Sequence, residues 1–346
     1  MSADGRRTPT ISILCPVYRT EPFLRAAIDS VLAQTRDDWE LVVVDNGLSD
    51  EVVDIVGSVG PDPRIVLVRQ ENRGLDGGVT AARAAASGRY LLPLCSDDML
   101  VPSTCERFVD VLDARPEIDV VSSDAYLYDE QRRCYLPQSW LRFADAPAAD
   151  PDHRVDLLEV VGGRDVYYGS AFRREVWDAE GGYADGNASD LGLWLRVLRA
   201  ERDVRVLPER LGVCRVREGS ITTDPVSSGF TELVEGLFEA AVEGSPDPRL
   251  RDALDRRLRR RRYTVSLASA RQALRRGDTE TARARARSAL SYRVTPRSVG
   301  VLAAVTVAPT LVRRLHPYKQ DVQLVLSRMR RRAIRASGSG ADANRA

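Results

Sequence analysis

The first 125 residues alternate short apolar, β-rich runs with segments whose apolar residues follow a helical spacing. Strands separated by helices in this way indicate a largely parallel sheet with helices on both faces. The pattern therefore predicts an α/β fold. Strands are expected over 10–18, 40–45, 64–68, 90–95 and 119–124, and helices over 21–34, 50–57, 77–88 and 102–114.

Polar residues follow two of these strands. Asp45 and Asn46 end ELVVVDN, and Asp97 and Asp98 end YLLPLCSDD. In a parallel sheet the ligand site lies beyond the carboxyl ends of the strands, which is where all four residues fall. If the strand before Asp97 ends in a turn, one carboxylate can accept hydrogen bonds from hydroxyl groups while the other binds a hard divalent cation such as Mg²⁺. The alternative is a solvated Asp-Asp turn that only ends the strand.

The pattern weakens over residues 126–168 and returns over 167–201, where an amphipathic helix carries Leu191, Trp194 and Leu198 on one side. Two short strands are expected within 204–216, and the chain beyond about residue 225 is expected to be helical.

Charge separates the two ends of the chain. Residues 251–346 contain 24 Arg and Lys against 6 Asp and Glu, whereas the whole chain has a net charge of only +1. Such asymmetry indicates two modules. Four interpretations of this basic part are open. It forms a solvated face, or it binds an anionic membrane with the apolar run 298–312 in the interface. Alternatively, it forms a small helical bundle that buries this run, or it packs against the acidic part of this chain or of a second copy. It lacks the interleaved aromatic residues of a nucleic-acid-binding surface, so no nucleic-acid partner is expected.

Composition indicates an ordinary globular protein, with 43% apolar and 29% charged residues. No apolar run is long enough to span a bilayer, and residues 1–10 lack a signal-peptide core. The five cysteines have no metal-binding spacing, which favours buried thiols in a reducing compartment. We expect a cytoplasmic protein, located at the inner face of the membrane if its basic helices bind lipid.

Four segments, in this order, resemble the family 2 inverting glycosyltransferases: TISILCPVYRTEPFLRAAIDSVLAQT, ELVVVDNGLSDE, ENRGLDGG with ASGRYLLPLCSDDML, and GGYADGNASDLGLWLRVL. Together they cover roughly residues 10 to 220. The resemblance implies a GT-A fold, a Rossmann-like and mostly parallel sheet sandwiched by helices, here with an α-helical C-terminal extension. The expected domains are a nucleotide-sugar-binding catalytic domain over 1–224, a basic helical region over 225–336 and a disordered tail over 337–346.

The resemblance also implies an activity. It is the inverting transfer of a sugar from a nucleotide-sugar donor to a hydroxyl group, by a single displacement assisted by Mg²⁺ or Mn²⁺. The acceptor would be a glycan, a lipid-linked molecule or a small molecule, in the synthesis of a cell-surface glycan, polysaccharide or glycoconjugate. A homo-oligomer is compatible with this activity.

Matching positions imply roles for individual residues. Asp190 takes the place of the general base, although hydrogen bonds at a helix N-terminus would lower its pKa and weaken it as a base. Asp98 would hold the metal on the diphosphate, and Asp97 would face the ribose. A later segment, CRVREGSIT, carries Arg217 where the family has His, and this guanidinium suits a diphosphate. The remaining donor-binding residues, at the base or ribose, would be Pro16, Val17, Tyr18, Glu21, Asp45 and Asn46. Tyr168, Gly169 and Ser170 resemble the acceptor side.

The sequence also departs from the family pattern, at Cys95, Asn46, Ser189 and Arg217. The resemblance places an acidic residue at the position of Cys95. These departures motivate an alternative, a non-catalytic nucleotide-sugar-binding or scaffold protein with a degenerate GT-A fold. A nucleotidyltransferase is a third possibility, disfavoured because the chain has no Gly-rich phosphate loop followed by Lys.

Overall fold

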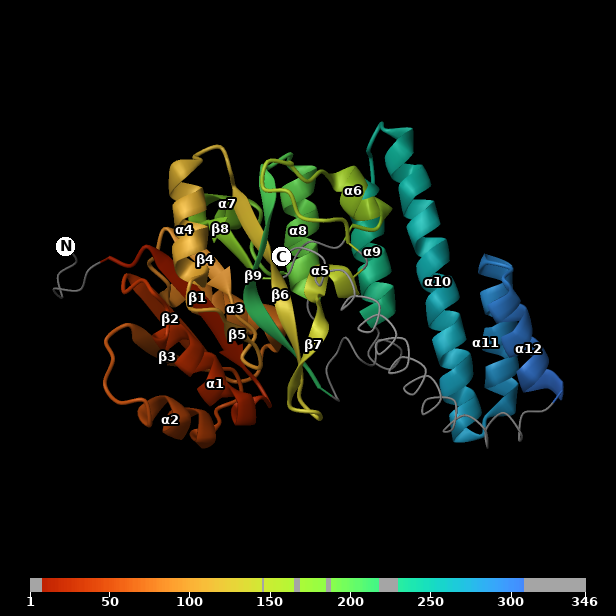
Figure 1. Ribbon diagram of the computed structural model, residues 1–346, viewed down its shortest axis with the longest axis horizontal. Coiled ribbons are helices and arrows are strands. Elements are labelled where there is room, and N and C mark those ends of the chain that lie inside the picture. Colours follow the sequence, from red (N-terminus) through yellow and green to blue (C-terminus); the bar gives the residue numbers. More distant parts are fainter. Residues whose placement is uncertain (1–7, 145, 165–168, 185–187, 218–229, 308–346) are drawn as a thin grey trace, which may run out of the picture. The chain divides into compact units, whose positions relative to one another are not determined.

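The computed structural model describes residues 8–144, 146–164, 169–184, 188–217 and 230–307 (Figure 1). The chain divides into two compact units, Met1–Arg257 and Leu258–Ala346. The domain boundary expected at residue 224 falls among residues 218–229, outside the described part, and stays a prediction.

The first unit is built on one mixed sheet (Figure 1). Its strand order is β3-β2-β1-β4-β8-β6-β9-β5, with β7 beside β6. The strands are β1 (Ile11–Val17), β2 (Trp39–Asp45), β3 (Ile65–Arg69), β4 (Tyr90–Pro93), β5 (Met99–Leu100), β6 (Val120–Asp129), β7 (Cys134–Ser139), β8 (Ser170–Arg173) and β9 (Val204–Val216).

The first four strands pair in parallel, as the alternating pattern predicts. The second half of the sheet differs from the mostly parallel expectation. β8 lies antiparallel between β4 and β6, β5 and β7 are also antiparallel to their partners, and only the β6–β9 pair is parallel. A parallel strand needs a crossover connection, usually a helix, and residues 126–168 carry no regular helical pattern of that length. The two strands expected within 204–216 form the single strand β9, whose pairing with β6 shifts register beside Asp124.

Twelve helices are assigned in the described residues: α1 (Glu21–Leu32), α2 (Asp50–Gly57), α3 (Gly74–Ala85), α4 (Thr104–Ala114), α5 (Trp140–Phe143), α6 (Leu157–Gly162), α7 (Arg174–Ala179), α8 (Ser189–Arg199), α9 (Phe230–Val242), α10 (Pro248–Arg276), α11 (Thr279–Tyr292) and α12 (Pro296–Val307). α3 begins three residues before the expected start, because Asn72 Oδ1 accepts a hydrogen bond from the amide of Gly74, whose φ of 76° suits glycine.

Alternate residues of β1 face opposite sides of the sheet. Ile11, Ile13 and Cys15 belong to a large buried core cluster that includes residues of α1 and α4. On the other side α3 approaches closely, since a Cβ on Gly78 would lie 2.8 Å from Pro16 Cβ. Helices therefore cover both faces of the sheet.

A buried carboxylate ties the start of β4 to β2. Glu40 is 9% exposed and accepts hydrogen bonds from Ser12 Oγ at 2.6 Å and from the amide of Gly88 at 3.1 Å. A Cβ on Gly88 would lie 2.6 Å from that Ser12 hydroxyl, so glycine is required there. Glu40 thus has a structural role.

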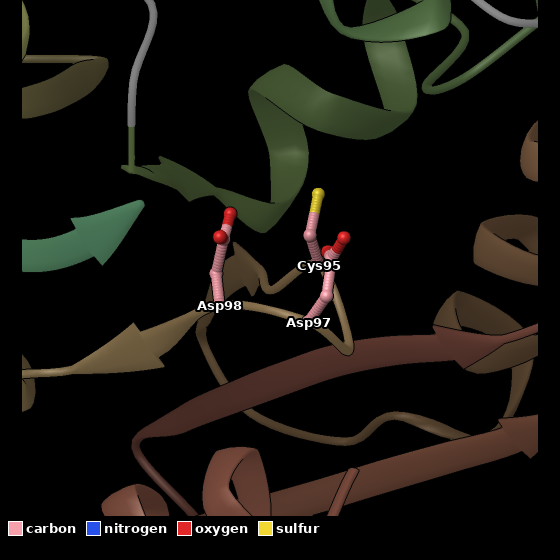
Figure 2. Close-up of side chains that lie close together, drawn as sticks. All are labelled: Cys95, Asp97 and Asp98. Atoms are coloured by element: carbon pink, nitrogen blue, oxygen red, sulfur yellow. The ribbon is translucent and has the colours of Figure 1, made fainter. Parts of the chain in front are cut away.

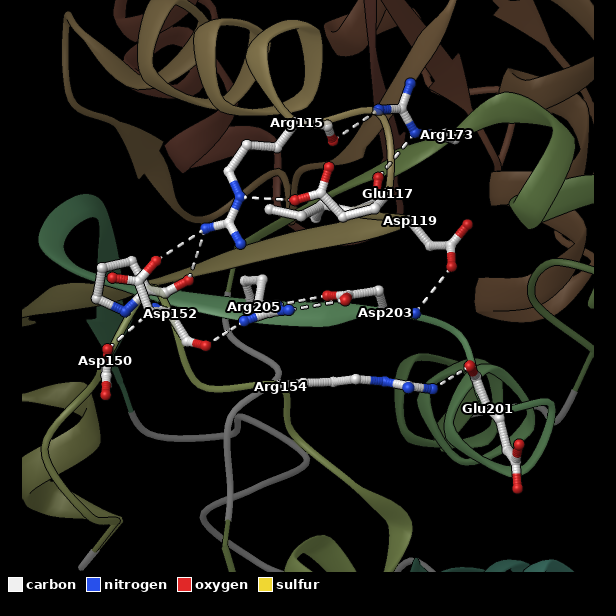
Figure 3. Close-up of polar contacts among 12 residues, drawn as sticks. Arg115, Glu117, Asp119, Asp150, Asp152, Arg154, Arg173, Glu201, Asp203 and Arg205 are labelled. Atoms are coloured by element: carbon white, nitrogen blue, oxygen red, sulfur yellow. Dashed lines mark hydrogen bonds and ion pairs between the residues drawn. The ribbon is translucent and has the colours of Figure 1, made fainter.

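A polar network joins the opposite ends of the strands, before β6 and β9 begin (Figure 3). Arg173 Nε donates to the carbonyl of Ile118 at 2.7 Å, and Asp119 Oδ2 accepts from the amide of Asp203 at 2.8 Å. Arg115 donates to Asp152 at 3.1 Å, which attaches the segment before α6 to the end of α4. This network holds the frame and contributes no residue to the site.

The second unit contains most of α10 with α11 and α12. The Asp278 carboxylate caps α11 by accepting from the amide of Thr281 at 3.0 Å. A small apolar core includes Leu274, Ala282 and Val305, with Val301 packed against it. Part of the run 298–312 is therefore buried, as the helical-bundle alternative predicts, and residues 308–312 lie outside the described part. Within the described residues no helix is both long and apolar enough to cross a membrane.

Candidate functional site

The residues Cys95-Ser96-Asp97-Asp98 form a tight turn, which Leu94 separates from the end of β4. The amide of Asp98 donates to the carbonyl of Cys95 at 2.9 Å, the hydrogen bond of a four-residue β-turn. The Ser96 hydroxyl lies 2.7 Å from that of Thr20, just before α1. The turn is thereby fixed to the start of α1.

The turn directs three side chains to the same side (Figure 2). One donor atom from each of Cys95, Asp97 and Asp98 lies within 4.8 Å of the others. Asp98 is only 9% exposed, so the alternative of a solvated Asp-Asp turn is wrong.

Positive and polar partners from the end of β9 offset the two adjacent carboxylates. Arg217 Nε lies 2.8 Å from Asp97 Oδ2, and the backbone amide of Arg215 lies 2.7 Å from Asp98 Oδ1. The Arg215 side chain donates to the carbonyl of Asp97 at 2.7 Å and pairs with Glu130. Arg215 is therefore structural, whereas the Arg217 side chain is 21% exposed at the edge of the site.

Beside the turn lies a pocket of about 110 Å³. Asp98 and Asp190 both line it, together with Cys95, Tyr183 and the apolar side chains of Phe172 and Trp194. Two carboxylates that are 92 residues apart in the chain therefore face one largely apolar pocket.

Asp190 lies in the first turn of α8, and Ala188 occupies the N-cap position. Burial raises the pKa of the Asp190 carboxyl, and hydrogen bonds from the amides of Leu191 and of Asp190 itself oppose this shift without overcoming it. The sequence-based expectation of a lowered pKa is therefore wrong. Helix-end hydrogen bonds can be predicted from the sequence, whereas the surrounding apolar pocket cannot.

Tyr183 is a pocket residue that the sequence interpretation missed. Its ring stacks on Trp177 with a centroid distance of 5.2 Å. The preceding Gly182 has a φ of 59°, and a Cβ there would lie 2.6 Å from Trp177 Nε1. Burial, and then the carboxylate of Asp190, raise the pKa of the Tyr183 hydroxyl well above its usual value. The two glycines before Tyr183 are the signal that a tight turn places this ring.

A second residue of the pocket has an unusual environment. Ser170 is 5% exposed, and its hydroxyl has no hydrogen-bond partner among the described residues. Gly169 lines the same pocket, so two of the three expected acceptor-side residues meet Asp190 there. The third, Tyr168, lies outside the described residues.

The five thiols are all free. Cys15 and Cys105 are buried as expected, but Cys95 and Cys134 are exposed, because one lies in the turn and the other on the outer strand β7. Cys95 faces the pocket, where the surrounding protein, and then the carboxylates of Asp98, Asp97 and Asp190, raise its thiol pKa well above the usual value.

The residues expected at the nucleotide gather at the ends of β1 and β2, where Val17 pairs with Asp45. Tyr18 follows β1, 43% exposed, and a Cβ on Gly47 would lie 3.1 Å from its ring. Pro16 precedes Val17 in β1, and Glu21 opens α1. The Tyr18 ring is partly exposed, and the Arg19 guanidinium lies over it at 5.0 Å from the ring centroid.

The side chains of Asp45 and Asn46 already bind protein groups. Asp45 accepts from the amide of Ser49 and from Arg69 Nε, each at 2.9 Å. Asn46 donates to Gly74 O and Asn72 Oδ1, and its Oδ1 accepts from Gln70 Nε2 and from the amide of Arg73. The side-chain Nδ2 of Asn46 thus donates two hydrogen bonds and its Oδ1 accepts two. The side chain is therefore fully used in holding residues 70–74. Its contact with a nucleotide stays a prediction.

The donor set of the turn fits a divalent cation. It offers carboxylate oxygens, which hard cations prefer, and one thiol, all on a turn that other elements hold in place.

Residues 12–158 match the family described as Glycosyl transferase family 2. "Uncharacterized glycosyltransferase EpsJ" of Bacillus subtilis (strain 168) is 27% identical over 240 residues, which are 68% of this chain and 69% of that protein. The family match includes Asp45, Asp97 and Asp98 and ends before Asp190.

Solved structures show the same fold. S. aureus TarS 1–349 in complex with UDP-GlcNAc superposes with a TM-score of 0.58 and 17% identity over 90% of this chain and 92% of that one. The mannosyltransferase PcManGT from Pyrobaculum calidifontis, in complex with GDP-Man and Mn²⁺, gives 0.54 and 19% over 90% of this chain and 85% of that one. The expected GT-A fold is thus confirmed, with a mixed sheet.

Proposed function

We propose that this chain is a glycosyltransferase of family 2 that transfers a sugar from a nucleotide-sugar donor to a hydroxyl acceptor with inversion at the anomeric carbon. The observation that carries this proposal is that Asp98, on the turn after β4, and Asp190, on α8, line one pocket. A donor diphosphate at Asp98 and an acceptor hydroxyl at Asp190 would then be neighbours.

Asp190 is proposed as the general base. The acceptor oxygen attacks the anomeric carbon while the bond between this carbon and the diphosphate oxygen breaks, and Asp190 takes the hydroxyl proton. A single displacement of this kind inverts the configuration. The raised pKa of Asp190 favours the role, because a general base is more effective when its pKa lies nearer the working pH.

The donor is proposed to lie across the ends of β1, β2 and β4. The nucleotide base would contact Tyr18, together with Pro16, Val17 and Glu21, near Asp45. Asp97 would accept a hydrogen bond from a ribose hydroxyl. Arg217, now paired with Asp97, would donate its planar fork to the diphosphate. Bound UDP-GlcNAc and GDP-Man in two proteins of this fold support the donor class.

A divalent cation on Asp98 is proposed to complete the donor site. When bound, such a cation offsets the charge that develops on the departing diphosphate. The Mn²⁺ in the PcManGT complex supports a metal of this class. Asp98 is prepared for the role because the amide of Arg215 orients one of its oxygens.

The acceptor is proposed to be a sugar hydroxyl of a growing glycan, entering beside Gly169 and Ser170.

The basic C-terminal region is proposed to hold the enzyme on the inner face of an anionic membrane. The 24 basic residues of 251–346 support this placement. Sedimentation with vesicles of anionic against neutral lipid tests this placement, and equal binding to both would exclude it.

Nucleotide-sugar turnover tests the activity. We expect Asp190→Asn to lose transfer while it still binds a nucleoside diphosphate, and Asp98→Asn to lose both transfer and metal-dependent nucleotide binding. Normal transfer in both variants would refute the mechanism. Donor binding by the unmodified protein, without transfer to any acceptor or hydrolysis, would favour the non-catalytic alternative.

A further inference from the structure

We propose that Cys95 acts with Asp98 as a protein donor to the cation, and that its sulfur makes the site prefer thiophilic ions such as Co²⁺ and Zn²⁺ over Mg²⁺. The inference rests on the proposed function for the presence of a cation. It differs from the sequence-based expectation of Mg²⁺ or Mn²⁺, which considered carboxylates alone.

The β-turn supplies the geometry. Cys95 and Asp98 are the first and last residues of the turn, closed by the 2.9 Å hydrogen bond from the Asp98 amide to the Cys95 carbonyl. Their sulfur and oxygen atoms lie within 4.8 Å of each other. Bonds from one ion to sulfur at about 2.3 Å and to oxygen at about 2.1 Å together span up to about 4.4 Å. Side-chain adjustments of a few tenths of an ångström therefore allow one ion to bind both atoms.

Asp97 is the least suited of the three to bind the ion directly. Its Oδ2 accepts from Arg217 at 2.8 Å, and a guanidinium at this distance competes with a cation for the same carboxylate. The thiol of Cys95, at the position where the family resemblance implies an acidic residue, is the nearby donor that replaces a carboxylate.

The pocket gives independent support for a ligand at this place. The Ser170 hydroxyl, in a residue only 5% exposed, has no partner among the described residues and belongs to the lining of the pocket that Cys95 and Asp98 share. A buried hydroxyl without a partner is costly, so a polar ligand is expected to enter this pocket.

The chemistry of sulfur decides which ion is preferred. Mg²⁺ takes oxygen ligands and retains its water, whereas thiolates favour softer ions such as Zn²⁺. Replacing one carboxylate by a thiol therefore weakens the site for Mg²⁺ and strengthens it for Co²⁺ and Zn²⁺.

Titration of the full-length protein with Co²⁺ tests this inference, because bonding between thiolate and Co²⁺ gives a charge-transfer absorption band in the near ultraviolet. We expect the band in the unmodified protein, its displacement by Zn²⁺ and its loss in Cys95→Ser. Cys134→Ser is the matched control, since Cys134 is the other exposed thiol and lies on β7. It should keep the band.

Cys95→Asp provides a second readout. With oxygen donors only, the advantage of Co²⁺ over Mg²⁺ in raising the melting temperature with UDP or GDP should shrink. No band in the unmodified protein, a band that persists in Cys95→Ser, or a band that is lost only in Cys214→Ser would overturn the inference.

The outcomes separate this inference from the proposed function. A Cys95-dependent band in a protein that transfers no sugar would leave the inference standing and refute the activity. Sugar transfer without such a band would support the activity and refute the role of Cys95.

Discussion

The guanidinium of Arg217 lies 2.8 Å from the carboxylate of Asp97, and this pair joins the end of β9 to the turn after β4 across 120 residues of sequence. Both side chains are about one-fifth exposed, so the pair lies at the rim of the site where a donor would enter. Arg217 thus offsets the charge of Asp97, the neighbour of Asp98 in the turn, before any ligand arrives.

Substitution of Arg217 by Gln should weaken nucleoside diphosphate binding. A hydrogen bond to a charged group contributes about 1.5–3 kcal/mol, so the Kd should rise about 10- to 100-fold. Calorimetric titration with UDP and GDP measures the change. Arg132→Gln is the control, because Arg132 pairs with Asp129 in an exposed ion pair. Equal affinities in both variants would contradict a role of Arg217 at the diphosphate.

The raised pKa of Asp190 should be visible in the pH profile of transfer. Only the ionised carboxylate accepts a proton, so activity should fall as pH drops through the raised pKa, at a higher pH than the ordinary aspartate value of about 3.9 allows. The profile of kcat/KM against pH measures this limb in the free enzyme. A limb at the ordinary aspartate value would contradict the burial of the base.

The same shift affects stability. At a pH below about 3.9, the pKa of Asp190 in the unfolded chain, this carboxyl is protonated in both the folded and the unfolded state. As pH rises, the carboxyl ionises first in the unfolded chain. The free energy of unfolding therefore falls until pH passes the pKa of Asp190 in the folded protein. Asp190→Asn removes this penalty and keeps an oxygen for the helix-end amides. The variant should gain stability relative to the unmodified protein between pH 4 and pH 7, as measured by urea unfolding. A relative loss over that interval would reverse the assigned sign.

Asn46→Asp should destabilise the first unit, although it restores the acid implied by the family resemblance. The substitution replaces an amide that donates to Gly74 O at 2.8 Å by a carboxylate oxygen, leaving two acceptors facing each other. A loss of about 1–3 kcal/mol is expected from such an unpaired buried group. Urea unfolding measures it, with exposed Gln131→Ala as a control that should change little. Unchanged stability in Asn46→Asp would show that the loop 70–74 does not depend on these bonds.

Gly182→Ala should damage the pocket more than Gly181→Ala. Both glycines have positive φ, 59° and 76°, so each alanine adds a similar backbone strain of roughly 1 kcal/mol. Only at Gly182 does the new Cβ meet the Trp177 ring, at 2.6 Å, while nothing lies within 4 Å at Gly181. The Gly182 variant should therefore lose more stability and more transfer activity, because it displaces the Trp177–Tyr183 stack. Equal losses would mean that this stack does not position the pocket.

The parts of the fold that the sequence predicted are those with a local signal. Alternating apolar runs and helical spacing are written within windows of about ten residues, and they correctly predicted β1 to β4 and the helices between them. Residues 126–168 lack such a signal, and neither β7 within them nor the antiparallel placement of the following strand β8 between β4 and β6 was predicted.

The sequence by itself determined which chemistry is available: the adjacent carboxylates Asp97 and Asp98 after a strand, and Asp190 at the start of a helix. Only the tertiary structure decided their state, because desolvation and charge pairing depend on groups far away along the chain. The pocket around Asp190, the Arg217 partner of Asp97 and the hydrogen bonds that occupy Asn46 all arise from such distant segments. Local patterns specify the elements, and the packing of those elements sets the protonation, pairing and accessibility of the site.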